Sequence, residues 1–167
     1  MREQLTPGDV KKIQEEIEYR KLVVRKRAIE AVKEARAQGD LSENFEYYAA
    51  KRDKNQNESR IRYLENMLKN ARIISDRSRP DEIGMNDTVT VYFEDDDEEE
   101  TYRLVTSIRG DSMKGLISIE SPLGRAIRGR HVGDRVTVRV SEKSQYEVII
   151  RAIEKTGEQE SDQIRIY

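Results

Sequence analysis

The chain has 167 residues, enough for one domain of ordinary size or two small ones. Charged residues make up 38% and hydrophobic residues 35%, so an elongated fold with much surface per unit of core is expected. The net charge of −2 excludes a uniformly basic nucleic-acid coat, although basic residues can still gather on one face.

Residue types that are scarce exclude several kinds of site. Cysteine is absent, so disulfides, thiolate metal sites and cysteine nucleophiles are excluded. The single histidine, His131, excludes a multi-histidine metal site, and we expect it at a surface or loop position. No apolar run approaches the ~18 residues of a membrane span, and the N-terminus lacks the hydrophobic segment of a signal peptide. We therefore expect a cytoplasmic protein without a membrane partner.

The first part of the chain has the pattern of a long amphipathic helix. Thr6 is its expected N-cap, Pro7 suits the first helical position, and Asp9 interacts favourably with the helix dipole. Gly39 is expected to end this helix.

A second helix is predicted from about Glu43 to Arg72. Its inward positions follow steps of three and four residues, as in a coiled coil, and are Tyr47, Ala50, Lys54, Asn57, Ile61, Leu64, Leu68 and Ala71. These positions match the stripe of the first helix around a turn near Asp40–Leu41. The match predicts an antiparallel hairpin ~45 Å long at the helical rise per residue. Lys54 and Asn57 are expected to set its register.

Short β-branched segments and turns dominate the second half. We predict strands at Thr88–Phe93, Thr101–Ile108, Gly115–Ser121, Arg135–Val140 and Tyr146–Ile153. A short helix is predicted at Pro122–Arg128, with Ser121 as its N-cap and Gly129 after its end. The fold class is therefore α+β: a long antiparallel coiled-coil hairpin, then a small antiparallel sheet with one helix.

The change of pattern gives four predicted segments. The hairpin occupies residues 1–76, a polar linker 77–80, the sheet domain 81–154, and a polar, mobile tail 155–167. The acidic run 94–100 is expected to form a solvated hairpin loop. It has neither glycine nor EF-hand spacing, so calcium binding is not expected.

Two carboxylates lie at the predicted turn of the hairpin, Asp40 and Glu43. Their spacing fits an acidic capping box in which Asp40 caps the second helix, and this is the commoner use of such a pair. The alternative is a pair that binds a divalent cation. Mg²⁺ takes six oxygen ligands, so two carboxylates would have to complete a site that belongs to another molecule.

The sequence around this turn closely resembles the tip of the bacterial Gre transcript cleavage factors. The similarity lies in residues 35–44, followed by Glu46-Tyr47 and Ala49-Ala50-Lys51, with further matches at Leu5-Thr6, Arg60-Ile61, Leu64-Glu65, residues 121–129 and Val132-Gly133-Asp134. The resemblance covers about residues 5–153. It implies a second domain similar to the FK506-binding-protein fold.

The resemblance implies a transcription elongation factor that stimulates cleavage of backtracked RNA by bacterial RNA polymerase. In that family the second domain docks at the rim of the polymerase secondary channel, and the tip reaches the catalytic centre near the nascent RNA 3′ end. Asp40 and Glu43 match acidic tip residues that help hold Mg²⁺ shared with the polymerase and position the attacking water. The protein would then be a catalytic accessory rather than an independent nuclease. It would bind no metal stably by itself, and the internally matched hairpin favours a monomer.

The resemblance also implies roles for other residues. Ser42, Asn44 and Phe45 are candidates for tip support or RNA contact. Phe45 stands where the family usually has a small residue, and packing within the tip is favoured over stacking on a base. Eight residues are candidates for steering RNA through its phosphates, with a solvated helix face as the alternative: Arg20, Lys21, Arg25, Lys26, Arg27, Lys51, Arg52 and Lys54. The polymerase-docking candidates, which also begin the short helix, are Glu120, Ser121, Pro122 and Leu123.

Three other functions remain open. A Gre-like regulator would occupy the same channel without inducing cleavage, although the presence of both Asp40 and Glu43 favours cleavage. A peptidyl-prolyl isomerase would need an aromatic-lined pocket, and the second half contains no tryptophan and few aromatic residues. An unrelated scaffold whose hairpin binds a helical protein would not depend on the charge of the tip.

Overall fold

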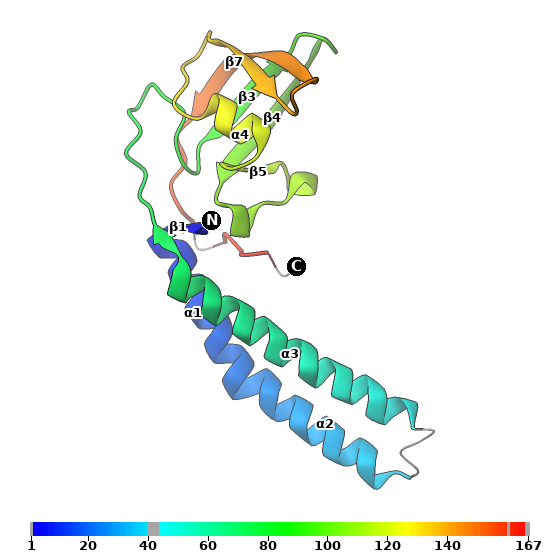
Figure 1. Cartoon of the computed structure of the whole chain (residues 1–167). Coiled ribbons are helices and arrows are strands. Elements are labelled where there is room, and N and C mark those ends of the chain that lie inside the picture. Colours follow the sequence, from blue (N-terminus) through cyan, green and yellow to red (C-terminus); the bar gives the residue numbers. More distant parts are fainter. Residues whose placement is uncertain (1, 40–43, 160, 166–167) are drawn as a thin grey trace. The chain divides into compact units, whose positions relative to one another are not determined.

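The computed structural model describes residues 2–39, 44–159 and 161–165 (Figure 1). The chain forms two compact units. One comprises Met1–Glu3 and Val10–Ala71, and the other comprises Gln4–Asp9 and Arg72–Tyr167. This division differs from the predicted boundary at residue 76, because the segment that leads into the first helix belongs to the unit that contains the large sheet.

Two long helical segments make up most of the first unit and run antiparallel (Figure 1). The first segment contains α1 (Pro7–Tyr19), the π-helical turn η1 (Arg20–Val24) and α2 (Arg25–Ala37), and the second is α3 (Phe45–Asn70). Contacts between them run in opposite chain directions: Arg36 meets Tyr47, Arg25 meets Glu58, and Glu16 meets Arg60. The two predicted helices are therefore present, with α3 slightly shorter at both ends than expected.

The π-helical turn was not predicted, and it lies opposite the buried side chain of Asn57. The amide of Asn57 donates to the backbone oxygen of Arg20 at 3.3 Å and accepts from the Arg20 guanidinium at 3.0 Å. π-Helical turns change the backbone hydrogen-bond ladder locally, so carbonyl oxygens can meet side-chain donors there. Asn57 thus pairs specifically with Arg20 of the opposite helical segment. A buried amide with one specific partner can set the register of two helices.

The second unit contains a five-stranded sheet with the order β5-β4-β3-β7-β6. Its strands are β3 (Thr88–Phe93), β4 (Glu98–Val105), β5 (Leu116–Ser118), β6 (Arg135–Arg139) and β7 (Gln145–Glu154). All five predicted strands are confirmed; β3 has the predicted bounds, and the other four have shifted ends. The sheet is mixed rather than antiparallel as predicted, because β4 and β5 run parallel. The 3₁₀ turns η2 (Ser107–Arg109) and η3 (Ser112–Lys114) lie in the connection between those two strands.

The predicted short helix is α4 (Pro122–Ile127), and it covers part of the sheet (Figure 1). Its side chains Leu123 and Ile127 join the hydrophobic core with residues of β3, β4, β6 and β7, including Val91, Val138 and Ile150. Alternating inward residues of the strands supply most of this core, as expected for a sheet with one covered face.

Two very short strands were missed by the sequence analysis. β1 (Gln4–Leu5) pairs in parallel with β2 (Arg72–Ile73), so the segment before α1 lies beside the segment after α3. Two-residue strands have no periodicity that a sequence pattern could show.

The acidic run occupies a tighter hairpin than expected. Only residues 94–97 form the turn between β3 and β4, and Asp97 adopts a left-handed conformation with φ of 50°. Residues 98–100 already belong to β4. Glu94 accepts two hydrogen bonds from Arg135, at 2.9 and 2.8 Å.

No helix within the described residues combines the length and the apolar character that crossing a membrane requires.

Candidate functional site

The tip end of the hairpin is organised by Asn44. Its side-chain oxygen accepts a hydrogen bond from the backbone N–H of Tyr47 at 3.0 Å, which makes Asn44 the N-cap of α3. Its side-chain nitrogen donates to the backbone oxygen of Ala35 at 2.6 Å. One amide therefore binds backbone groups at the ends of two helices: it satisfies the Tyr47 N–H and adds to the hydrogen bond that the Ala35 oxygen accepts from the Gln38 N–H at 3.3 Å. The prediction that Asp40 caps the second helix is wrong.

The acidic pair itself lies outside the described residues, together with Leu41 and Ser42. Asp40 and Glu43 follow α2 and precede α3 in the sequence, so they belong to the connection between the two helices. Because Asn44 supplies the cap of α3, neither carboxylate is needed for that role.

The aromatic residues at the start of α3 have opposite environments. Phe45 is 86% exposed, so the expectation that it packs within the tip is wrong. Tyr47 is buried instead, and Arg36 donates to its hydroxyl group at 3.5 Å. That hydrogen bond from Arg36 holds the pKa of Tyr47 below its usual value. The ring of Tyr48 stands edge-on to that of Tyr47, with 5.4 Å between the centroids.

The eight candidate basic residues fall into two groups. Arg20, Lys21 and Arg25 form ion pairs at 2.7–2.8 Å with the hairpin carboxylates Glu16, Glu65 and Glu58, respectively. For the other five, no ion pair is formed with any residue that the structure describes; they are Lys26, Arg27, Lys51, Arg52 and Lys54. The positive charge available to an external anion thus lies in the part of the hairpin nearer the tip.

The candidate docking residues lie at the start of α4. Ser121 accepts a hydrogen bond from the N–H of Gly124 at 3.0 Å, which confirms it as the N-cap. Glu120 accepts hydrogen bonds from Gln4 at 3.4 Å and from Ser107 at 3.0 Å. Pro122 is exposed, whereas Leu123 is 8% exposed and packs in the core. The side chain of Leu123 therefore supports this surface from beneath and offers little area to a partner.

A buried polar cluster around Asp9 was missed by the sequence analysis. Asp9 forms the predicted helix start with Thr6: the Thr6 N–H donates to the Asp9 carboxylate at 3.0 Å, and the Asp9 N–H donates to the Thr6 hydroxyl oxygen at 3.1 Å. The same carboxylate also accepts from the Thr106 hydroxyl group at 2.6 Å and pairs with Arg109 Nε at 2.7 Å. Arg109 further donates to Asn86 at 2.7 Å.

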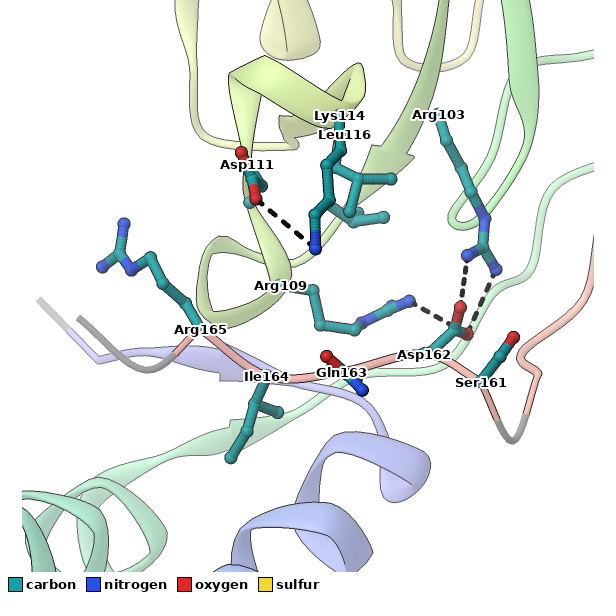
Figure 2. Close-up of a pocket in the computed structure, with 12 residues that line it drawn as sticks. Arg103, Arg109, Asp111, Lys114, Leu116, Ser161, Asp162, Gln163, Ile164 and Arg165 are labelled. Atoms are coloured by element: carbon teal, nitrogen blue, oxygen red, sulfur yellow. Dashed lines mark hydrogen bonds and ion pairs between the residues drawn. The ribbon is translucent and has the colours of Figure 1, made fainter.

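Part of the C-terminal tail lies beside this cluster. Figure 2 shows Asp162 facing Arg103 and Arg109 at a cavity of about 370 Å³. Arg103 donates two hydrogen bonds to the Asp162 carboxylate, at 2.5 and 3.2 Å. Burial raises the pKa of Asp162, but hydrogen bonds from Arg103 and the Gln159 backbone, with the charge of Arg109, outweigh burial and lower it. Asp162 therefore connects the tail to Arg103 and Arg109 through ion pairs.

Only Thr6-x-x-Asp9 signalled any part of this cluster in the sequence. Arg109 is the last residue of the 3₁₀ turn η2 and precedes Gly110, in a connection without any periodic pattern. His131 lies at the surface, as expected, 3.7 Å from Asp81 and 3.6 Å from Asp134. Within the described parts of the chain, no three His, Cys, Asp or Glu side chains are grouped so that they could hold a metal ion.

Comparison with known proteins identifies both parts of the chain. Residues 3–73 match the family model described as "Transcription elongation factor, N-terminal", and residues 78–155 match "Transcription elongation factor, GreA/GreB, C-term". Transcription elongation factor GreA of Geobacillus kaustophilus is 47% identical over 135 residues, which cover 80% of this chain and 85% of that relative. The factor of the same name from Brucella anthropi is 44% identical over 147 residues, covering 87% and 94%.

A solved structure with 24% identity is that of GreA factor homolog 1 (Gfh1) of Thermus thermophilus. It aligns over 93% of this chain and 100% of that chain, with a TM-score of 0.43. The sequence relatives carry the assignment, because they are 44–47% identical over 80–87% of this chain. This protein therefore belongs to the GreA/GreB family of transcription elongation factors.

Proposed function

We propose that this protein stimulates hydrolytic cleavage of backtracked nascent RNA in the active site of bacterial RNA polymerase. The observation that carries the proposal is that Asn44, and neither acidic tip residue, is the N-cap of α3. Asn44 caps α3 and binds Ala35, so the cap of α3 requires neither carboxylate of the connection, Asp40 or Glu43. Membership of the GreA/GreB family supports the same function.

In this proposal the hairpin acts as a coiled coil that enters the polymerase secondary channel. The sheet unit, which we expect to be similar to the FK506-binding-protein fold, docks at the channel rim through Glu120, Ser121 and Pro122. The basic residues without a described ion pair bind phosphates of the extruded RNA, and counterion release favours that contact. The protein acts in the cytoplasm as a monomer and as a catalytic accessory, because the polymerase supplies most of the active site.

The donor set at the tip fits a shared magnesium ion. Two carboxylates provide part of the six-oxygen shell that Mg²⁺ requires, and the polymerase, the RNA and water would supply the rest. When bound, the ion would lower the pKa of a bound water and stabilise charge on the leaving oxygen. Asp40 and Glu43 would hold and orient the shared ion and accept hydrogen bonds from the attacking water.

The test is RNA cleavage in a purified, backtracked elongation complex from the source organism. The wild-type protein would be compared with Asp40→Asn and Glu43→Gln, which keep side-chain size but lose the charge that Mg²⁺ requires. Glu46→Gln is the matched control, because Glu46 is an exposed acidic residue in the first turn of α3.

We expect wild type and Glu46→Gln to shorten the RNA, and each tip variant to lose at least most of this activity while still binding polymerase. If no protein shortens the RNA although wild type binds, a channel-binding regulator without cleavage activity is the better assignment. If both tip variants cleave like wild type, the proposed role of the acidic pair is wrong.

A further inference from the structure

Two exposed aromatic side chains lie on one face at the start of α3. Phe45 is 86% exposed and Tyr48 is 52% exposed. Their spacing of three residues places them next to each other on the helix surface. Arg52 lies four residues beyond Tyr48 on the same face, and it is also exposed. We call the surface formed by Phe45, Tyr48 and Arg52 the aromatic face.

The rings of Phe45 and Tyr48 differ in their contacts with other aromatic rings. Tyr48 stands edge-on to the buried ring of Tyr47, which in turn contacts Arg36. Phe45 forms no ring pair with any aromatic residue in the described parts of the chain. At 86% exposure, the Phe45 side chain leaves most of its surface open to an external planar group. Phe45 follows Glu43 by two residues, so its ring belongs to the tip region.

We propose that Phe45 stacks on a base of the extruded RNA strand, with Tyr48 flanking that base and Arg52 binding a neighbouring phosphate. This inference rests on the proposed function and adds a positioning contact to it. Single-stranded nucleic acid is bound by aromatic side chains that stack on bases, next to cations that follow the backbone. Every base has a π-face, so the contact would tolerate any RNA sequence.

The charges around the aromatic face favour RNA over a protein surface as its occupant. Lys51 and Arg52 are exposed and form no described ion pair. Cations beside an exposed ring suit a polyanion with planar bases. Since stacking would hold the RNA strand near the acidic pair, its loss should lower the rate of cleavage without changing the chemistry at the tip.

The first experiment measures single-turnover cleavage rates of backtracked complexes with Phe45→Ala, Phe45→Trp and Tyr63→Ala. Tyr63 is the matched control: it is 48% exposed on the same helix, ~27 Å from Phe45 at 1.5 Å per residue. We expect Phe45→Ala to lower the rate about tenfold, within the range that removal of one stacked base contact produces. Phe45→Trp should restore the rate, and Tyr63→Ala should match wild type.

The second experiment distinguishes contact of Phe45 with an RNA base from contact of Phe45 with a protein surface. The same rates are measured on RNA that carries an abasic nucleotide at each extruded position in turn. If Phe45 stacks on a base, wild type slows at one abasic position, and Phe45→Ala causes no further loss there. If Phe45→Ala slows cleavage by the same factor on every RNA, Phe45 contacts protein, and the inference is overturned. It is also overturned if Phe45→Ala cleaves base-containing RNA at the wild-type rate.

A readout without cleavage distinguishes failure of this inference from failure of the proposed function. An extruded 2-aminopurine nucleotide reports stacking through loss of its fluorescence. We expect the Asp40→Asn protein to quench this signal in the backtracked complex, and the Asp40→Asn, Phe45→Ala protein to bind without quenching. Equal quenching by both proteins would exclude the stacking contact. If wild type cleaves no RNA yet quenching depends on Phe45, only the cleavage function fails.

Discussion

The side-chain nitrogen of Asn44 lies 2.6 Å from the backbone oxygen of Ala35 and donates a hydrogen bond to it. Ala35 lies in the last turn of α2 and Asn44 is the N-cap of α3, so the two residues flank the connection that carries Asp40 and Glu43. Because the same amide caps α3 through Tyr47, this residue couples closure of the hairpin to the start of the second helix. The tip thus has a defined support on each side of its acidic residues.

Replacing Asn44 should separate these two roles. Asn44→Ala loses both hydrogen bonds, and we expect the free energy of unfolding to fall by about 1–2 kcal/mol. Asn44→Asp keeps the acceptor for the Tyr47 N–H but cannot donate to Ala35, so its loss should be smaller. Urea denaturation would measure both values. Equal stability of Asn44→Ala and wild type would show that the two hydrogen bonds of Asn44 make no net contribution to the free energy of unfolding.

Breaking the pair between Asp9 and Arg109 should be far more damaging than breaking a surface pair. Both side chains are buried, and Asp9→Ala leaves the Arg109 charge without that carboxylate. We expect a loss of about 3–5 kcal/mol in the free energy of unfolding. Glu94→Ala is the control, because it removes an exposed ion pair with Arg135 and should change stability little. Similar losses in both variants would contradict this prediction.

The anchored tail should make stability depend on pH through Asp162. Its pKa is lowered in the folded protein, so its contribution is complete above the ordinary carboxyl pKa and is lost as pH falls through the lowered value. Asp162→Asn should therefore be less stable than wild type at pH 7, and the difference should shrink below about pH 4. Urea denaturation between pH 7 and pH 3 would test this. A difference that stays constant with pH would rule out the ion pair as its cause.

Position 124 in α4 should accept only glycine. A Cβ atom there would lie 2.0 Å from the backbone oxygen of Ser118, too close for a side chain to relax. Gly124→Ala should lower the free energy of unfolding by about 2 kcal/mol or more, since overpacking displaces backbone. Gly157→Ala is the control, because its Cβ would meet open space. Thermal unfolding would compare the two, and an unchanged midpoint for Gly124→Ala would disprove the predicted clash.

Local patterns in the sequence were sufficient for the regular elements. The three- and four-residue steps predicted α3, short β-branched segments predicted strands such as β3 and β7, and the serine before a proline predicted α4. Each signal acts over a few residues, where backbone geometry and side-chain spacing decide the outcome. The Gre-like tip and its acidic pair were likewise visible in the sequence, because their residues are adjacent.

Tertiary structure alone decided which residues meet across the chain. Thr106 binds Asp9 from 97 positions away, and no local pattern could have indicated that contact. Asp40 was the predicted cap of the second helix, whereas Asn44 is the cap of α3 and also binds Ala35 on the opposite helix. The parallel pairing of β4 with β5 and the exposure of Phe45 have the same origin. Side-chain burial and strand pairing depend on which surfaces the folded chain brings together. A pattern along the sequence specifies only which face of a helix or strand is apolar and can be buried.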